Sequence, residues 1–307
     1  MSYRLFTDAT ADLTPELMEG LPEVTVLPMD ITLDGRSFVC GPGGITPAAF
    51  YAAQRAGKFA STSQIRPAVY LDAFEDCLRS GADVLYLCFS SGMSATCQTA
   101  QLCAAELRER YPQRRVLCLD TLCASVGEGF LVREAARRQA EGFTLDELAA
   151  WVLESRSRVC HWFTVDTFEH LKHGGRMSGA AAAVGTVLQI KPLLHVSGQG
   201  TLEVAEKPRG AQRAMAAQLA RMEKGWTPAH GTLVLVGHGD CPDRAAELRA
   251  QIERRFPTAQ VMTAPIGPVI GAHTGPGMLA VIFWGKNRAE KASIADKIAS
   301  RVRGRSE

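Results

Sequence analysis

Short apolar runs alternate with longer segments of helical spacing in the first half of this chain, and this alternation limits its fold most strongly. The run Val84–Phe89 stops at a Ser-Ser-Gly turn, and a helical pattern follows from Ser94 to Arg110. Val116–Leu119 is followed in the same way by a helical segment through Arg138. The spacing of Thr144 and Glu147 predicts a capping box at the start of a further helix, from Leu145 to about Ser155. Because parallel strands need helical crossovers, we predict that residues 1–158 form a doubly wound α/β domain with a parallel sheet.

The pattern changes after about residue 158. Leu193–Val196 and Leu202–Glu206 flank the sequence Ser-Gly-Gln-Gly, which is typical of a β-hairpin. Further elements are predicted as strands at Leu233–Gly237, Val261–Ala264 and Leu279–Trp284 and as helices at Ala211–Met222 and Arg244–Phe256. Residues 159–307 therefore indicate an α+β domain with antiparallel strands. The interface between two such domains is the default place for a ligand.

Charge and cysteine usage exclude several classes of protein. The 307 residues contain 34 Lys and Arg against 32 Asp and Glu, so a nucleic-acid partner, which needs a basic face, is not expected. The first ten residues lack the basic start and apolar run of a secretory signal, which predicts a cytoplasmic protein.

The nine cysteines form no C-x-x-C pair, and we expect them to be free thiols.

Metal and nucleotide signals are weak as well. His170 and His173 are three residues apart, which places them on one face of a helix, but no acid or Cys/His group completes a ligand set. The chain has no G-x-x-x-x-G-K-[ST] loop. No metal and no cofactor are therefore expected.

Four polar or glycine-rich turns carry the chemistry that the sequence offers. They are Thr7–Asp12, Ser61–Gln64, Ser90–Ser94, and the pair Gly174–Arg176 with His273–Gly277. Hydroxyl groups together with the free N–H groups of a helix start suit a carboxylate or a phosphate. The third turn has the best position, because it follows a strand that is expected to be central in the parallel sheet. Each turn is also compatible with ordinary helix capping or a tight turn.

The serines of the third turn allow a different function. Ser91 or Ser94 would serve a hydrolase or transferase if a base such as His273 came within hydrogen-bond reach. The turn lacks the G-x-S-x-G spacing of a nucleophile elbow, and neither a histidine nor an acid lies near it in sequence. A bound anion is therefore favoured over an acyl-enzyme, and the hydrolase remains an alternative.

Taken together, these segments resemble the DegV family of bacterial fatty-acid-binding proteins, over nearly the whole chain. Six motifs appear in the family's order. They are TDATADL (Thr7–Leu13), STSQ (Ser61–Gln64), SSGMSAT (Ser90–Thr96), LKHGGRMS (Leu171–Ser178), IKPLLHVSGQG (Ile190–Gly200) and HTGPG (His273–Gly277). Departures from the family pattern, such as Ala9 and Ala95, affect the details of ligand and partner recognition more than the fold.

The resemblance implies a two-domain protein that buries a long-chain fatty acid in an apolar tunnel at the domain interface. Thr62 and Ser94 match the family's carboxylate-binding hydroxyls, His273 matches the histidine near the head group, and Arg176 matches an arginine that serves the ligand or a docked kinase. The same motifs add Ser63, Ser91 and Gly92 to the predicted ligand-binding set. The Ala- and Gly-rich segment Met177–Ile190 is a possible lining of the tunnel.

The resemblance also implies a partner. An ATP-binding kinase subunit would phosphorylate the presented carboxylate, so this chain would carry the substrate without being an enzyme by itself. A carrier of a fatty acid is also expected to make transient contact with a membrane surface. A lipid-sensing module without a kinase partner is the second alternative, and sequence alone does not separate it from the carrier.

Overall fold

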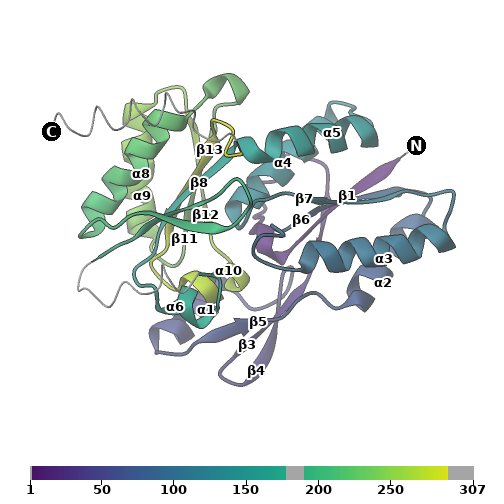
Figure 1. Ribbon diagram of the computed structural model, residues 1–307, viewed down its shortest axis with the longest axis horizontal. Helices are drawn as coiled ribbons and strands as arrows, with labels where there is room; N and C mark the ends of the chain where they lie inside the picture. The colour runs from purple at the N-terminus through teal and green to yellow at the C-terminus, as the bar shows by residue number, and fades with distance from the viewer. Residues whose placement is uncertain (1, 178–189, 290–307) are drawn as a thin grey trace.

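The first domain is built on a parallel sheet, as predicted. The computed structural model describes residues 2–177 and 190–289. Four strands lie in the order β2-β1-β6-β7, with bounds Val24–Leu27, Tyr3–Asp8, Asp83–Cys88 and Val116–Asp120. Helices α2 (Pro67–Arg79), α3 (Thr96–Arg110), α4 (Val126–Ala140) and α5 (Leu145–Ser155) accompany them (Figure 1). The predicted capping box of α5 is confirmed, since Thr144 and Glu147 bond each other's backbone.

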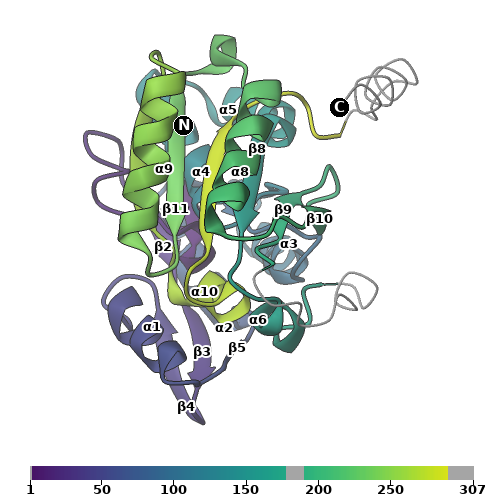
Figure 2. The same cartoon turned by 90° about the vertical axis from the view of Figure 1, so that its left-hand side faces the viewer.

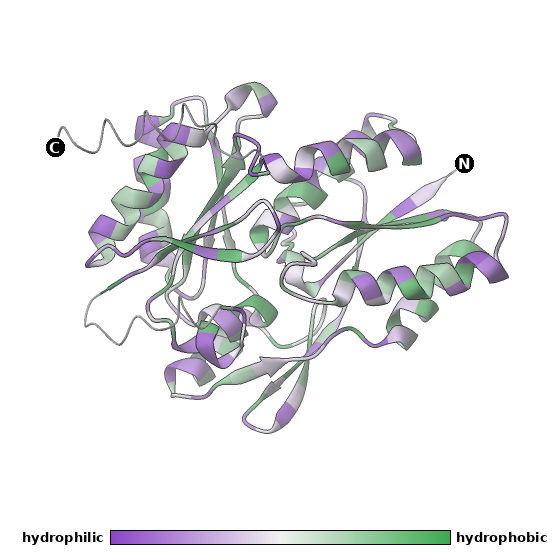
Figure 3. Ribbon diagram, viewed as in Figure 1, coloured by the Kyte–Doolittle hydropathy of each residue, from purple (hydrophilic) through white to green (hydrophobic). Residues whose placement is uncertain are grey.

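Strand β6 shows why the sheet needs helices on both faces. All six of its residues are buried, and successive side chains enter different cores. Val84, Tyr86 and Cys88 pack in the core that contains residues of α2 and α3. Leu85 and Leu87 pack instead in the core that contains residues of α4 and α5. The hydropathy colouring follows this arrangement, with green strands and mixed helices (Figure 3).

A third, small sheet was not predicted. The extended run Val24–Leu33 splits into β2 and β3 (Met29–Leu33), which belong to different sheets. Pro28 stands at the break, and proline cannot donate a ladder hydrogen bond. Strand β3 pairs in antiparallel fashion with β4 (Arg36–Cys40) and β5 (Ala60–Thr62), and helix α1 (Pro47–Arg55) joins β4 to β5.

The second domain contains a mixed six-stranded sheet in the order β10-β9-β8-β13-β11-β12. The bounds are β8 Val159–Thr164, β9 Leu193–Val196, β10 Leu202–Glu206, β11 Leu233–His238, β12 Gln260–Pro265 and β13 Leu279–Trp284. The predicted hairpin β9-β10 is confirmed, while β11 and β12 run parallel. Helices α8 (Ala211–Gly225) and α9 (Pro242–Arg255) lie side by side over one face (Figure 2).

Helix α4 connects the two domains. Its buried residues share one core with Leu5 and Leu85 of the parallel sheet and with Phe163 and Ile282 of the mixed sheet. Two short helices, α6 (Glu169–His173) and α10 (Pro268–Thr274), lie beside the small sheet (Figure 1). The domain interface, where the sequence predicts a ligand, is therefore bordered by both large sheets.

Three further points concern single features. All nine cysteines are free, as predicted. In the part of the chain that the structure describes, no helix has the length and apolarity that a bilayer crossing requires. The predicted lining segment Met177–Ile190 falls, apart from its two end residues, outside the described residues.

Candidate functional site

A mainly apolar cavity lies between the domains. Its empty volume, including the opening to solvent, is about 1100 Å³. The apolar part of its wall comes from both domains: Met29, Phe89, Met93, Ala124, Val126, Phe163, Leu171, Val196, Leu202, Val269, Ile270, Met278, Ala280 and Ile282. Such a wall binds a ligand mainly by removing its apolar surface from water.

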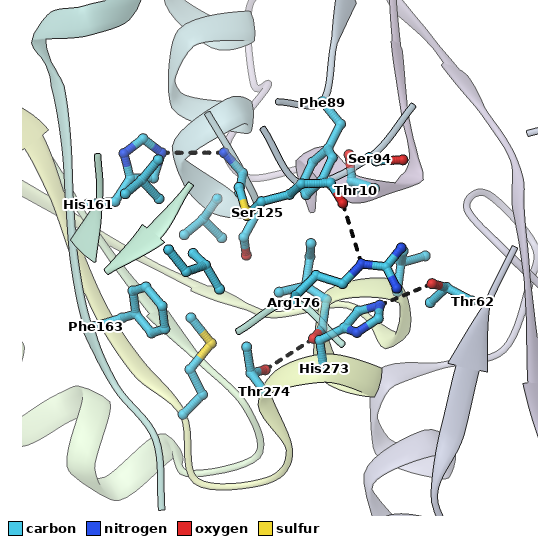
Figure 4. A pocket seen from close by; sticks show the side chains of 18 of the residues that line it. Thr10, Thr62, Phe89, Ser94, Ser125, His161, Phe163, Arg176, His273 and Thr274 are labelled. Atoms are coloured by element: carbon cyan, nitrogen blue, oxygen red, sulfur yellow. Dashed lines mark hydrogen bonds between the residues drawn. The ribbon is translucent and has the colours of Figure 1, made fainter. Parts of the chain in front are cut away.

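Thr62 and His273 meet at one end of this cavity. Thr62 ends strand β5, His273 lies on helix α10, and Thr62 Oγ1 is 3.0 Å from His273 Nε2 (Figure 4). Burial, together with the charge of Arg176, lowers the pKa of His273 to about 4. The imidazole is therefore uncharged at neutral pH. Its Nδ1 is buried without a hydrogen-bond partner, so we place the single proton on Nε2, donated to Thr62 Oγ1.

Ser94 and Ser63 line the same cavity. Ser94 precedes helix α3, and its Oγ lies 2.7 Å from Thr96 Oγ1 and accepts a hydrogen bond from the Thr96 N–H. Ser63 Oγ donates to the Asp30 carbonyl at 3.3 Å. Ser94 thus stands at a helix start, where backbone N–H groups favour an anion.

Arg176 supplies the positive charge at this end. Its Nη1 donates to the Gly174 carbonyl at 2.7 Å and its Nε to the Met93 carbonyl at 3.4 Å. These two bonds hold the guanidinium over the cavity beside His273 (Figure 4). The side chain remains exposed, so it is accessible both to a bound ligand and to a docked protein.

Ser91 and Gly92, in contrast, do not line the cavity. Ser91 Oγ donates to Asp120 Oδ2 at 2.5 Å, and its N–H donates to Asp120 Oδ1 at 3.1 Å. Gly92 lies so close to the β9-β10 hairpin that an added Cβ would be 2.6 Å from the Gln199 carbonyl. Both residues therefore shape the loop that holds Ser94, and the predicted contact with a ligand has no support from their position.

The opening motif forms a buried acid network behind the cavity wall. Thr10 lines the cavity, and its Oγ1 lies 2.5 Å from Asp8 Oδ1 and 2.8 Å from Glu128 Oε2. Tyr86 donates to the other oxygen of Asp8, and the Thr10 N–H donates to Oδ1. Burial raises the pKa of both carboxyl groups. Since Thr10 has one hydroxyl proton, one of the two carboxyl groups must supply the second hydrogen bond.

Sequence reasoning missed Ser125 and His161, which also line the cavity. His161 is buried and uncharged because burial holds its pKa well below the usual value. A Cβ on Gly127 would be 2.1 Å from His161 Nε2, and one on Gly129 would be 2.3 Å from the Ala11 carbonyl. Two glycines inside one helix were the available signal, since they indicate close approach by other segments.

The described residues contain no group of His, Cys, Asp and Glu that suits a metal ion. This includes His170 and His173, whose rings pack against Phe59 at centroid distances of 4.9 Å and 4.8 Å. The histidines of helix α6 therefore contribute to packing at the rim of the site.

Gly174 offers a way to displace His273 without changing a charge. An added Cβ would be 2.0 Å from His273 Nδ1, whereas the backbone of Gly174 is helical and accepts alanine. We expect Gly174→Ala to move the imidazole away from Thr62 and to weaken ligand binding about tenfold, the effect of one lost hydrogen bond. Isothermal titration with the fatty acid that the family resemblance implies measures this. Lys172→Ala on the same helix is the control, and equal affinities for both variants would contradict the role of His273.

Comparisons with known proteins identify the family of this chain. A family model described as "Uncharacterised protein, DegV family" matches residues 2–286. A DegV domain-containing protein of Clostridium perfringens is 36% identical over 287 residues, covering 93% of this chain and 98% of its own. A structure described as fatty acid binding of a DegV family protein from Thermus thermophilus is 31% identical, with a TM-score of 0.81 over 93% of this chain and 100% of its own.

Two further structures share the fold. The fatty acid binding DegV family protein of Streptococcus agalactiae is 28% identical, with a TM-score of 0.80 over 92% of this chain and 98% of its own. The Fatty Acid Kinase B3 protein of Streptococcus pneumoniae, loaded with linoleic acid, has a TM-score of 0.81 over 92% and 99%, and its 20% identity shows the fold alone. With the match to the family model over nearly its whole length, this chain belongs to the DegV family.

Proposed function

We propose that this protein binds a long-chain fatty acid in the interdomain cavity and presents the carboxylate, at Thr62, Ser94, His273 and Arg176, to an ATP-dependent kinase subunit that forms an acyl phosphate. The observation that carries the proposal is the distribution of polar groups. The wall is apolar over most of its area, and the side chains of Thr62, Ser94, His273 and Arg176 lie on one side of it, beside helix α10 and the start of α3.

The apolar wall supports a long alkyl chain as the ligand. Each buried CH₂ contributes about 0.8 kcal/mol, so a chain of a dozen or more carbons supplies most of the binding free energy. The polar end then has only to orient the carboxylate. The names of the Thermus thermophilus and Streptococcus agalactiae relatives, both of which describe fatty acid binding, support the same class of ligand.

The polar end is suited to hold a carboxylate that must still react. His273, uncharged near neutral pH, donates to Thr62, which leaves the Thr62 hydroxyl hydrogen free to donate to the ligand. Ser94 offers a second hydroxyl, and Arg176 stabilises the charge from an exposed position. Neither hydroxyl removes the charge of the carboxylate, so its oxygen stays nucleophilic toward the γ-phosphate of ATP.

The contacts do not favour a serine-dependent hydrolase. Ser94 Oγ is paired with Thr96, Ser91 Oγ with Asp120, and His273 Nε2 with Thr62. Within residues 2–177 and 190–289, neither serine forms a hydrogen bond with a histidine or with a carboxylate that faces the cavity. The proposed role is therefore that of a substrate carrier.

The central test removes both hydroxyls. We expect Thr62→Ala combined with Ser94→Ala to weaken binding of oleate or palmitate at least tenfold, because each charge-assisted hydrogen bond contributes about 1.5 to 3 kcal/mol. Mass spectrometry of gently extracted protein and titration with added acid measure this. Ser91→Ala is the matched control, since its hydroxyl bonds Asp120 outside the cavity. Unchanged affinity in the double variant would refute the assignment.

The kinase step needs its own measurement. The loaded protein is mixed with ATP and a candidate kinase subunit, and acyl phosphate is trapped as the hydroxamate. Formation of the hydroxamate supports the carrier role, and its absence with every such subunit leaves the lipid-sensing alternative. Arg176→Ala in the same assay separates the two roles of the guanidinium, because loss of the product with the acid still bound assigns it to the kinase.

A further inference from the structure

The Asp12 side chain lies where three segments of the chain meet. Its Oδ2 accepts a hydrogen bond from Ser125 Oγ at 2.6 Å, and its Oδ1 accepts one from the Gly267 N–H at 2.8 Å. Ser125 directly precedes helix α4, and Gly267 directly precedes helix α10. One buried carboxyl group therefore ties the opening turn of the first domain to the starts of a helix from each domain.

The backbone around Asp12 is built for this contact. A Cβ on Gly267 would be 2.4 Å from Asp12 Oδ1, so only glycine permits the approach. Ser125 has φ 57° and ψ −147°, a region that residues other than glycine rarely occupy. Asp12 itself is left-handed, with φ 49°. Such conformations persist where surrounding contacts hold them, and the Asp12 bond is the contact made by the Ser125 side chain.

Helix α10 connects Asp12 to the ligand site. It has seven residues, and four of them line the cavity: Val269, Ile270, His273 and Thr274. Its first turn is fixed by the bond of Gly267 to Asp12, and its last turn presents His273 to Thr62. A shift of the first turn therefore moves the imidazole that orients the carboxylate.

We propose that Asp12 is a positioning residue that latches helix α10 to the start of helix α4, and that uptake of a proton by its carboxyl group loosens this latch and lowers the affinity of the cavity for a fatty acid. The inference rests on the proposed function for its ligand. The latch itself is defined by the three segments and stands apart from the identity of that ligand.

The charges around Asp12 place the transition near neutral pH. The groups that face it are Asp8 of β1, Glu128 of α4, Tyr51 of α1 and Cys40 of β4, all of them acidic or neutral. Burial, with a smaller effect of Asp8, raises the pKa of Asp12 to about 7, against the two hydrogen bonds that lower it. His273 does not titrate in this range, since its pKa is about 4.

Protonation changes the hydrogen bonds in a defined way. The Gly267 N–H can only donate, so the added proton must go to Oδ2, on the side of Ser125. The Ser125 hydroxyl must then turn its own hydrogen away from Asp12, and Gly267 is left with an uncharged acceptor. Both bonds lose their charge-assisted character, which is the stronger kind.

The test compares the natural protein with Asp12→Asn, which keeps the shape and the latch without a titrating group. The Asn oxygen accepts from Gly267, its NH₂ group donates to Ser125 Oγ, and asparagine tolerates left-handed backbone. Oleate affinity is measured by displacement of a fluorescent fatty acid at pH 6 and pH 8. We expect the affinity of the natural protein, relative to the variant at the same pH, to fall about fivefold at pH 6. This ratio removes the effect that ionisation and aggregation of oleate have on the measured affinity, because both proteins experience it equally.

A second variant tests the assignment to Asp12. Ser125→Ala removes one hydrogen bond to the charged form, so we expect the midpoint of the pH transition to move to higher pH. The proposal would be overturned if the affinity ratio of the natural protein to Asp12→Asn were the same at pH 6 and pH 8. It would also be overturned if the midpoint of the transition did not move in Ser125→Ala.

Amide exchange separates this inference from the proposed function. We expect the protection of the α10 amides, corrected for intrinsic exchange, to fall between pH 8 and pH 6 in the natural protein and to stay constant in Asp12→Asn. If neither protein binds oleate but this difference appears, the proposed function fails and the latch stands. If oleate binds and the protection is the same in both proteins, the latch fails alone.

Discussion

Replacing Ala280 by phenylalanine is expected to lower the affinity for a long-chain fatty acid by about 10²- to 10³-fold while the protein stays folded. Ala280 lies on β13, opposite Phe163 of β8, and both side chains line the cavity. A benzyl group there occupies the space of about four or five methylene groups of the ligand, each of which contributes about 0.8 kcal/mol on burial. The cavity accommodates the ring, so the cost of overpacking stays small.

The control for this variant lies next to it on the same strand. Val281 points to the opposite face of β13, into the core beneath α8 and α9. Val281→Ala damages the packing of the strand and leaves the volume of the cavity unchanged, so its affinity for the acid should stay near that of the natural protein. Titration at 25 °C, with thermal unfolding as a check on folding, makes the comparison. Strong binding by Ala280→Phe would show that the ligand lies elsewhere.

The second large effect concerns the buried acid network. Asp8 accepts three hydrogen bonds, from the Thr10 N–H, the Thr10 hydroxyl and Tyr86, and these favour its ionised form against the burial that raises its pKa. The Thr10 hydroxyl then has no proton left for Glu128, and Glu128 must be the protonated partner. We therefore expect Glu128→Gln, which copies a protonated acid, not to lower the free energy of unfolding at pH 7.

Asp8→Asn is expected to behave very differently. Its NH₂ group would face either Tyr86 or Thr10, both of which already donate, and leave a buried donor without an acceptor. We expect a loss of about 3 kcal/mol in the free energy of unfolding, measured by urea denaturation at pH 7. Equal effects of the two substitutions would contradict the placement of the proton on Glu128.

The pH dependence follows from the direction of the shift. The pKa of Glu128 in the folded protein is raised well above its ordinary value, so the folded state binds more protons than the unfolded state once the pH exceeds about 4.3. The free energy of unfolding therefore falls as the pH rises from there toward the raised pKa. Glu128→Gln removes this contribution, and its stability relative to the natural protein should increase from pH 5 to pH 8.

The two networks divide the opening motif between two tasks. Thr10 and Asp8 join the first sheet to helix α4, while Asp12 joins α4 to α10. Both tasks place carboxyl groups behind the wall that a ligand touches. The motif Thr7–Asp12 thus supports the cavity wall on the side away from a ligand, and Thr10 is the one residue of the motif that lines the cavity.

Local sequence patterns determined most of the secondary structure. The apolar run Val84–Phe89, the Thr144 capping box and the β9-β10 hairpin each depend on residues close together in the chain, and all three appear as predicted. The split of Val24–Leu33 lies at Pro28, but the sequence does not say that its two halves join different sheets. Both strands are extended, and only their partners, β1 on one side and β4 with β5 on the other, distinguish them.

The candidate site shows the same division between what sequence motifs predict and what only the tertiary structure shows. The motifs of the family resemblance named Thr62, Ser94, Arg176 and His273 from sequence alone, and Ser91 and Gly92 were named with them because a motif does not say which of its side chains faces a cavity. Only the tertiary structure directed Ser91 to Asp120 and brought Asp12, Ser125 and Gly267 into one latch. The sequence determines which groups are present and which local backbone they adopt. The contacts between residues far apart in the chain, and with them the pKa of each buried group, arise only when the two domains pack together.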